Sequence, residues 1–335
     1  MKRILALGGA GFIGSYVVRR LLEDGHHITV VDSFEKYGGI THDFFSHQNV
    51  GVLRKDVRSM HPREFHGYDV ILCLAALIGG IRYFHKIPYR IARDNTEMLS
   101  AAIDATLAAC PSATFVYFSS SMVYEKMQRP VSELDARAQP VPITNYGMQK
   151  LFGEYLVRGA HEECGLSYLT LRPFNAVGSG ELPDVGSDGA VEFGMAHVIP
   201  DFCYKALVRQ TPFEVFGDGK QVRTFTHARD IAEAIARLVE HEVVNDDFNI
   251  CGNDTLDMGD LAQRIWNRVN PGIAFPEVVS MPVPPSDVRF RIGMSTKLTA
   301  RIAWEPRYGI DFIIDDTYGY IERHMKRTSA QPAAL

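Results

Sequence analysis

Short apolar runs recur along the first half of the chain, and glycine or polar residues close each of them. The runs are Ile4–Leu7, Ile28–Val31, Val50–Leu53, Val70–Leu74, Phe115–Phe118 and Tyr168–Leu171. Their length is typical of buried strands, and most segments between them carry apolar residues at helical spacing. Strands that alternate with helices predict an α/β fold with a doubly wound, parallel sheet of the Rossmann type.

A glycine-rich turn follows the first apolar run. The sequence Gly8-Gly9-Ala10-Gly11-Phe12-Ile13-Gly14 lies between that run and a helical pattern. In this context Gly8 permits a tight turn, Gly11 lets a pyrophosphate approach the backbone, and Gly14 lets helix and strand pack closely. The unpaired N–H groups at the start of the helix also favour phosphate. The turn therefore predicts a dinucleotide-binding site.

The choice of dinucleotide depends on Asp32, which closes the second apolar run. A carboxylate at this position accepts hydrogen bonds from both hydroxyls of the adenosine ribose and repels a 2′-phosphate, so NAD is favoured over NADP. After the third run, Asp56-Val57-Arg58 suits a contact with the adenine.

Tyr146 and Lys150 lie four residues apart in a segment with a helical pattern, 145–156, so they share one face. A neighbouring ammonium lowers the pKa of a phenol, which lets Tyr146 exchange a proton with a sugar hydroxyl near neutral pH. Ser119-Ser120-Ser121 follows the fifth apolar run, where parallel sheets place their ligands. Together with the glycine turn, these residues indicate oxidation of a hydroxyl, or reduction of a ketone, beside a nicotinamide.

The order of motifs resembles that of extended short-chain dehydrogenases/reductases of the nucleotide-sugar epimerase/dehydratase family, over residues 2–320. The matching motifs are Gly8-x-x-Gly11-x-x-Gly14, Asp56-Val-Arg58, Leu74-Ala-Ala76, Asn95, Ser119-Ser-Ser-Met-Val-Tyr124, Tyr146-x-x-x-Lys150, Arg172-Pro-Phe-Asn175, His197-Val-Ile-Pro200, Phe216-Gly-Asp-Gly219 and Arg223-Thr-Phe-Thr-His-Ala-Arg-Asp230.

The resemblance implies a role for individual residues. Ser120, Tyr146 and Lys150 fall on the family's catalytic positions. Asn175 matches an asparagine that contacts the substrate, and Arg223 matches an arginine that grips a nucleotide diphosphate. The residues expected to bind the cofactor are Gly8, Gly11, Phe12, Ile13, Gly14, Asp32, Asp56, Val57, Leu74, Ala75, Ala76, Asn95, Ser119, Tyr146, Lys150 and Pro173. Those expected to bind the substrate are Gly79, Gly80, Ser121, Met122, Asn175, His197, Val198, Arg223 and Arg289.

Three features resemble the branch that contains GDP-fucose synthase and GDP-mannose 3,5-epimerase. Ile78-Gly79-Gly80-Ile81 resembles a loop that crosses the active site, and Val288-Arg289-Phe-Arg291 resembles a phosphate-binding stretch. His197 resembles a catalytic histidine, and here it either hydrogen-bonds the substrate or serves as an acid/base. Met122, however, stands where both enzymes place a proton-abstracting cysteine, and a thioether has no titratable proton. Removal of protons from ring carbons therefore lacks its usual base.

Three groups of functions follow from these observations. The favoured one is an NAD-retaining epimerase that inverts C4 of a GDP- or UDP-hexose through a transient 4-keto intermediate. The alternative is a 4-reductase/dehydrogenase similar to GDP-fucose synthase, or a 3,5-epimerase with a base other than the missing cysteine. The third, a non-catalytic NAD sensor or RNA-binding relative, is disfavoured by the intact set of Ser120, Tyr146 and Lys150.

The second half of the chain is richer in glycine, proline and aspartate over residues 173–221. A helical pattern returns over residues 223–240, which we expect to pack on the first unit. The predicted organisation is an NAD-binding domain of residues 1–172 plus 222–250, a smaller, discontinuous α/β substrate lobe of residues 173–221 plus 251–327, and a disordered tail of residues 328–335.

Composition limits the partners. At 335 residues, 46% hydrophobic and 22% charged, the chain can bury a large core. Its net charge of −5 argues against a nucleic-acid or anionic-membrane surface. The five cysteines have no metal-ligand spacing, so no metal is expected. No secretory or membrane-spanning run is apparent, which favours a cytoplasmic location. The family resemblance implies a homodimer through helices at residues 96–109 and 147–157.

Overall fold

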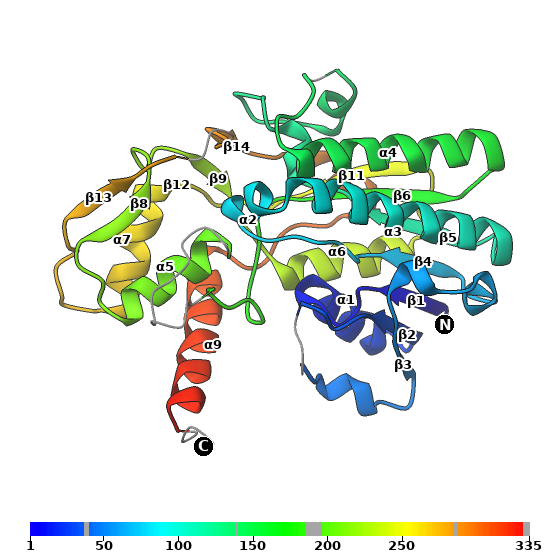
Figure 1. Ribbon diagram of the computed structural model, residues 1–335, viewed down its shortest axis with the longest axis horizontal. Coiled ribbons are helices and arrows are strands. Elements are labelled where there is room, and N and C mark those ends of the chain that lie inside the picture. The colour runs from blue at the N-terminus through cyan, green and yellow to red at the C-terminus, as the bar shows by residue number, and fades with distance from the viewer. Residues whose placement is uncertain (37–39, 139, 185–195, 284–286, 331–335) are drawn as a thin grey trace.

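The computed structural model describes residues 1–36, 40–138, 140–184, 196–283 and 287–330 (Figure 1). Within these residues the larger unit contains a seven-stranded parallel sheet in the order β11-β6-β5-β4-β1-β2-β3. Its strands are β1 (Arg3–Leu7), β2 (His27–Asp32), β3 (Val50–Arg54), β4 (Val70–Cys73), β5 (Thr114–Phe118), β6 (Tyr168–Pro173) and β11 (Asp246–Ile250). The predicted α/β fold with a parallel sheet is confirmed.

All six apolar runs of the first half are strands of this sheet, whereas β11 was not predicted. That strand lies at one edge and pairs with β6. Its first residues are Asp246 and Asp247, and Asn249 interrupts its apolar residues. These polar side chains have partners inside the protein, so the strand carries no continuous apolar run.

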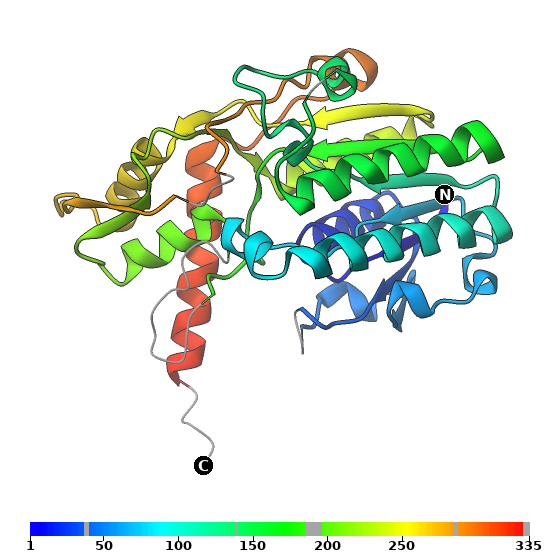
Figure 2. The ribbon, with the colours of Figure 1, turned by 45° about the horizontal axis from the view of Figure 1, so that its top comes forward.

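Helices cover both faces of the sheet (Figures 1 and 2). On one face α1 (Phe12–Glu23) packs against α6 (Ala228–Glu240). On the other face α3 (Pro88–Ala109) packs against α4 (Asn145–Cys164).

The alternation of side chains along β1 divides the core between these two faces. Ile4 and Ala6 belong to the core under α1 and α6. Leu5 and Leu7 belong to the core under α3 and α4. All four are fully buried, as expected for a parallel strand that is covered on both sides.

The smaller unit contains short strands and three main helices. Its strands pair as β7 (Ala176–Val177) with β10 (Thr226–His227), β8 (Phe213–Phe216) with β13 (Val278–Met281), and β9 (Val222–Thr224) with both β12 (Thr255–Asp257) and β14 (Phe290–Arg291). Its helices are α5 (Val198–Leu207), α7 (Met258–Val269) and α9 (Ile310–Ala330). Phe202, Phe213, Trp266 and Ile313 belong to their common core. The short helix α2 (Ile81–Lys86) precedes α3, and the short helix α8 (Thr296–Ile302) packs against β11. The domain boundaries given above stay a prediction.

Two expectations about helices were wrong in part. The helix expected over residues 223–240 begins only at Ala228, because β9 and β10 precede it. His227 caps it, with Nδ1 accepting a hydrogen bond from the Arg229 N–H at 3.1 Å. Helix α9 continues to Ala330, so residues 328–330 are helical rather than disordered. Residues 331–335 lie outside the described part of the chain.

Among the described helices, none combines the length and apolar character that crossing a membrane requires.

Candidate functional site

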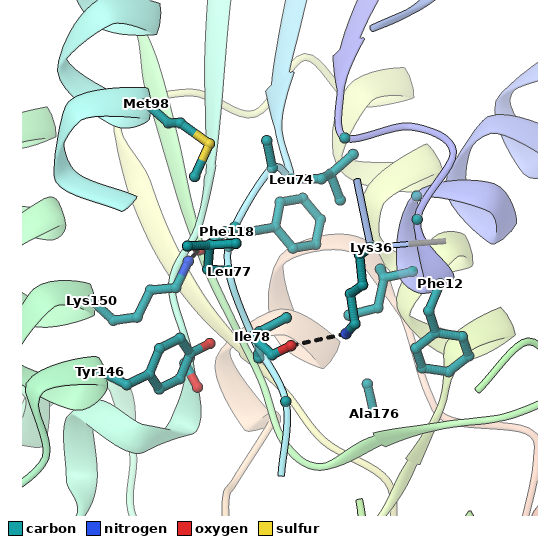
Figure 3. A pocket seen from close by; sticks show the side chains of 18 of the residues that line it. Phe12, Lys36, Leu74, Leu77, Ile78, Met98, Phe118, Tyr146, Lys150 and Ala176 are labelled. Carbon is teal, nitrogen blue, oxygen red and sulfur yellow. Dashed lines mark hydrogen bonds between the residues drawn. The ribbon is translucent and has the colours of Figure 1, made fainter. Parts of the chain in front are cut away.

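A cavity of about 410 Å³ lies across the carboxyl ends of the central strands (Figure 3). The glycine turn and Asp32 line one end, and Ser120, Tyr146 and Asn175 line the other. Open α/β sheets bind their ligands in this position. Most of the predicted site residues line it, namely Gly8, Gly11, Phe12, Ile13, Gly14, Asp32, Asp56, Val57, Leu74, Ala75, Ala76, Gly79, Gly80, Ser119, Ser120, Ser121, Met122, Tyr146, Lys150, Pro173, Asn175 and His197.

The glycine turn joins β1 directly to α1. Gly8 has φ +80°, and its N–H donates to the Val31 carbonyl at 2.7 Å. A Cβ on Gly8 would lie 2.6 Å from the Ala75 nitrogen, and a Cβ on Gly14 would collide with the Gly8 carbonyl. Only glycine therefore fits at these two positions, and the start of α1 faces the cavity. The cradle fits the pyrophosphate of a dinucleotide.

Asp32 lies at the end of β2, beside the glycine turn. One of its oxygens accepts from the Ala10 N–H at 3.2 Å and the other from the Phe34 N–H at 2.9 Å. These bonds hold the carboxylate at the rim of the cavity, where ribose hydroxyls of NAD would reach it.

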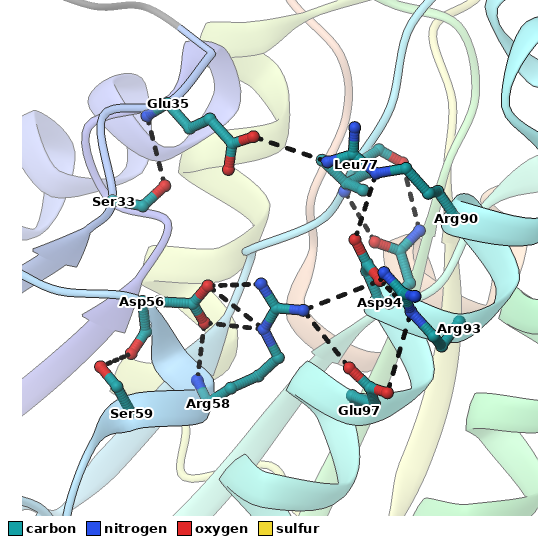
Figure 4. Close-up of polar contacts among 11 residues, drawn as sticks. Ser33, Glu35, Asp56, Arg58, Ser59, Leu77, Arg90, Arg93, Asp94 and Glu97 are labelled. Atoms are coloured by element: carbon teal, nitrogen blue, oxygen red, sulfur yellow. Dashed lines mark hydrogen bonds and ion pairs between the residues drawn. The ribbon is translucent and has the colours of Figure 1, made fainter.

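A network of charged residues lies beyond Asp32 and was not expected from the sequence (Figure 4). Arg58 pairs with Asp56 at 2.6 Å, and Arg90 approaches Glu35 at 3.5 Å. Both arginines also approach the buried Asp94, at 3.7 and 3.6 Å. The Arg58 side chain holds the pKa of the Asp56 carboxyl below its usual value. Asp56 is therefore ionised and held in place at this end of the cavity.

Lys36 extends into the cavity from the segment after β2. Its ammonium reaches across the cavity and donates to the carbonyl of Ile78 at 2.9 Å (Figure 3). Ile78 lies in the segment after β4. This contact joins two loops that come from different strands.

Tyr146 lies in the first turn of α4 and is 2% exposed. Its ring stacks on that of Phe84, with 4.6 Å between centroids. Burial raises the pKa of the phenol far above its usual value, while a hydrogen bond with Ser120 and the charge of Arg291 lower it. The Ser120 and Tyr146 hydroxyls therefore lie together, as the sequence predicted.

Lys150 lies one turn further along α4. Its ammonium donates to the Phe118 carbonyl at 2.6 Å and lies 5.8 Å from the centre of the Tyr146 ring. Burial lowers its pKa to about 8. The sequence assigned the charge beside the phenol to Lys150, but the structure adds Arg291, which lines the same cavity.

A buried ion network fixes the strand end before Ser120. The Ser119 hydroxyl donates to Glu154 on α4 at 2.5 Å. Arg172 on β6 donates to the same carboxylate at 2.7 Å and pairs with Asp247 on β11 at 2.7 Å. The network ties strands β5, β6 and β11 to the helix that carries Tyr146 and Lys150.

The far end of the cavity gathers residues of distant segments. Asn175 donates to the Thr224 carbonyl at 2.7 Å and accepts from Arg291 at 3.0 Å. The Nε atom of Arg291 is buried and has no hydrogen-bond partner in the protein. A guanidinium with an unused donor here can receive an acceptor group of a ligand.

His197 and Met122 complete this end. His197 precedes α5, and its Nδ1 contacts the carboxylate of Glu181. Burial alone would raise the pKa of Glu181, but the charge and hydrogen bond of His197 hold it below its usual value. Met122 is buried beside Phe84 and Tyr146, so its thioether forms part of the apolar wall.

Four residues expected in the site lie outside the cavity lining. Asn95 bonds the backbone of Leu77, at 2.7 and 3.1 Å, and so shapes the loop after β4. Val198 packs against the core of the smaller unit. Asn95 and Val198 can therefore affect a bound cofactor or substrate only through the residues that they contact.

The two arginines among the four are engaged elsewhere. Arg223 is buried and pairs with Asp287 at 3.2 Å, and burial lowers its pKa to about 9. Arg289 is half exposed and pairs with Asp218 at 2.7 Å. The arginine that reaches the cavity is Arg291, two residues further along. Glu181, Lys36 and Arg90 were also missed, because each stands alone in a segment without a motif.

Comparison with known proteins gives a consistent picture. Residues 4–251 match the model of the NAD dependent epimerase/dehydratase family. GDP-mannose 3,5-epimerase 1 of Oryza sativa subsp. japonica is 27% identical over 335 residues, covering 98% of this chain and 84% of that protein. UDP-glucose 4-epimerase of Halalkalibacterium halodurans is 26% identical over 340 residues, covering 96% of each. The structure of UDP-glucose 4-epimerase of Thermotoga maritima with UDP-glucose superposes with a TM-score of 0.80 at 25% identity, covering 96% of this chain and 99% of that one.

Proposed function

The chain belongs to the NAD-dependent epimerase/dehydratase family, and we propose that within it the protein inverts C4 of a nucleotide-linked hexose. The observation that carries the proposal is the side-by-side placement of Ser120 and Tyr146 next to Lys150, with the inert Met122 as their neighbour. This set can move a proton on and off one hydroxyl, and Met122 cannot take a proton from a ring carbon.

The residues of the cavity divide the work. The glycine turn and Asp32 would hold NAD, which accepts a hydride from the sugar and returns it. Tyr146 takes the proton of the C4 hydroxyl, and Ser120 hydrogen-bonds the same oxygen. Lys150 stabilises the phenolate through its charge. Asn175 and Arg291 bind acceptor groups of the sugar nucleotide, which leaves the ring free to present either face of the ketone.

The test is proton NMR in D2O with GDP- and UDP-hexoses and no added cofactor. We expect the C4 epimer to form without deuterium, because the hydride returns from the same bound NAD. A requirement for stoichiometric NAD(P)H would overturn the proposal in favour of a reductase.

The contact between His197 and Glu181 supports a second candidate, a 3,5-epimerase in which His197 replaces the missing cysteine. A histidine held by a carboxylate through Nδ1 keeps Nε2 for acid/base work. Deuterium incorporated at C3 or C5 in the same experiment would favour this candidate over simple C4 epimerisation.

We also propose that two copies of the chain associate through α3 and α4. On α4 the side chains of Met148, Phe152 and Tyr155 are exposed by 44, 45 and 57%, and their spacing puts them on one face. Tyr89 at the start of α3 is 69% exposed. Light scattering after gel filtration should give a dimer, and Phe152→Glu should give a monomer.

A further inference from the structure

Glu125 is a buried carboxylate that the proposed chemistry does not use. It follows the 3-10 turn Ser121–Tyr124 and is only 4% exposed. Its oxygens accept from the backbone N–H of Ile143 at 2.5 Å, from the N–H of Thr144 at 2.8 Å, and from the Thr144 hydroxyl. A charged group that accepts three hydrogen bonds in a buried site holds its partners firmly.

These bonds connect the two segments that carry the catalytic hydroxyls. On one side, Ser120 caps the 3-10 turn, with its hydroxyl oxygen accepting from the Met122 N–H at 3.2 Å. On the other side, Thr144 caps α4, with its hydroxyl oxygen accepting from the Gly147 N–H at 2.9 Å. Tyr146 lies in the first turn of α4, between that cap and Gly147. Glu125 is thus the direct link between the Ser120 turn and the start of the Tyr146 helix.

The link is tight. A Cβ on Gly147 would lie 2.8 Å from a Glu125 oxygen and 2.7 Å from the Met122 carbonyl. The first turn of α4 therefore packs against the Ser120 turn at a distance that only glycine allows. A shift of either segment would change the distance between the two hydroxyls.

We propose that Glu125 is a positioning residue that sets the separation of the Ser120 hydroxyl from the Tyr146 phenol. The inference rests on the proposed function in that these two hydroxyls act on the sugar. Glu125 contacts neither sugar nor cofactor in this role. It acts through Thr144 and the start of α4.

The first experiment separates positioning from general stability. Glu125→Gln keeps the size of the side chain but removes its charge. With the amide oxygen facing the two backbone donors of residues 143 and 144, it puts an amide donor opposite the Thr144 hydroxyl, which now donates to Glu125. We expect single-turnover hydride transfer to slow about 10- to 100-fold, because small misplacements of reacting groups have effects of that size. The NAD content should stay within about twofold, because the glycine turn and Asp32 are untouched.

Asp135 provides a matched control. It caps another 3-10 turn by accepting from the Ser132 N–H at 2.8 Å, with no link to Ser120 or Tyr146. Asp135→Asn should lower the melting temperature without slowing hydride transfer. If Glu125→Gln does not fold, Thr144→Val removes the side-chain part of the same link and takes its place.

A double-mutant cycle with Ser120→Ala tests the mechanism. If Glu125 acts by aligning Ser120 with Tyr146, the loss caused by Ser120→Ala becomes several-fold smaller in the Glu125→Gln background. Independent, multiplicative losses would overturn the inference and leave Glu125 a purely structural residue.

A last measurement needs no sugar and so separates this inference from the proposed function. In protein labelled with [13Cζ]tyrosine, the Tyr146 signal is assigned by its disappearance in Tyr146→Phe. In Glu125→Gln it should move toward its position in Ser120→Ala, because the same hydrogen bond is lost. An unmoved signal overturns the positioning role, whereas absent epimerisation with a moved signal overturns only the proposed function.

Discussion

The two ends of the cavity are built in different ways. The end at the glycine turn uses the carboxyl ends of neighbouring strands β1 and β2, so Gly8 and Asp32 come together through the two strands of one βαβ unit. The other end combines Tyr146, Asn175 and Arg291, which come from a helix, a loop and a short strand of the smaller unit. Local patterns therefore build the end that fits a dinucleotide, while the other end depends on contacts between distant segments.

The largest effect should come from removing the phenol at the second end. Tyr146→Phe loses the group that takes the proton, so hydride transfer should slow by about 10³-fold or more. The glycine turn is untouched, so the NAD content should not change. Absorbance at 340 nm in a single turnover measures the first quantity, and NAD released on denaturation measures the second. Loss of NAD in this variant would mean that the two ends are not separable.

Arg291 and Arg289 allow a matched comparison within one segment. Arg291 lines the cavity and bonds Asn175, whereas Arg289 is half exposed and pairs with Asp218. Arg291→Gln should lower kcat/KM for the sugar nucleotide by about 10²-fold, as expected for loss of a charged ligand contact. Arg289→Gln should change it less than about twofold, because exposed pairs contribute little. Equal losses would place the substrate at the outer surface instead.

Asp32 tests the cofactor end. Asp32→Asn keeps the size of the side chain and one of its two backbone hydrogen bonds, but it removes the charge that repels a 2′-phosphate, so the preference for NAD over NADP should fall about tenfold. Fluorescence titration of cofactor-stripped protein with both dinucleotides measures it. Asp56→Asn is the control, since an adenine contact affects both dinucleotides alike. An unchanged preference would show that Asp32 does not meet the ribose.

The smallest effect concerns stability and has a defined direction with pH. Burial lowers the pKa of Lys150 from 10.5 to about 8. Between these values the unfolded chain binds the additional proton, so this residue makes stability rise with pH, and below pH 8 its buried charge opposes folding. Lys150→Met should therefore raise the melting temperature at pH 7 by about 2–4 °C, although it abolishes turnover.

That gain should shrink as the pH rises from 8 and disappear well above pH 10.5, where the lysine is neutral in both the folded and the unfolded chain. Calorimetry of cofactor-stripped protein at several pH values measures the difference. Tyr146→Phe, on the same helix, is the control and should show no such trend below pH 10. A gain that stays constant with pH would mean that packing, rather than the buried charge, is responsible.

The same difference between local patterns and distant contacts separates the features that the sequence predicts from those that it does not. Six strands and the glycine turn were placed correctly because each has a continuous apolar run or a local motif. Strand β11 was missed because Asp247 and Asn249 face internal partners, Arg172 and Tyr124. No run of residues could reveal partners so far away in the chain.

Within the site, the arginines show where prediction from the sequence fails. Arg289 and Arg291 are equivalent candidates in sequence, and only the pairing of β14 with β9 decides which reaches the cavity. Arg223 was expected to face a diphosphate, but Asp287 occupies its guanidinium. Glu181 stands in a segment without a motif, and Glu125 lies just after a motif that assigns it no role, so their importance comes only from what they contact.

The hydrogen bond from Lys36 to Ile78 has a kinetic consequence. The Lys36 side chain and the Ile78 backbone together form a bar across the cavity, between Phe12 and Tyr146 (Figure 3). We expect a dinucleotide that enters or leaves at this end to require opening of this bond, whereas a sugar that approaches from the Arg291 end would not. An epimerase returns each hydride to the sugar from which it came, so it can turn over while this bond stays closed. A net reductase would have to open it at every turnover.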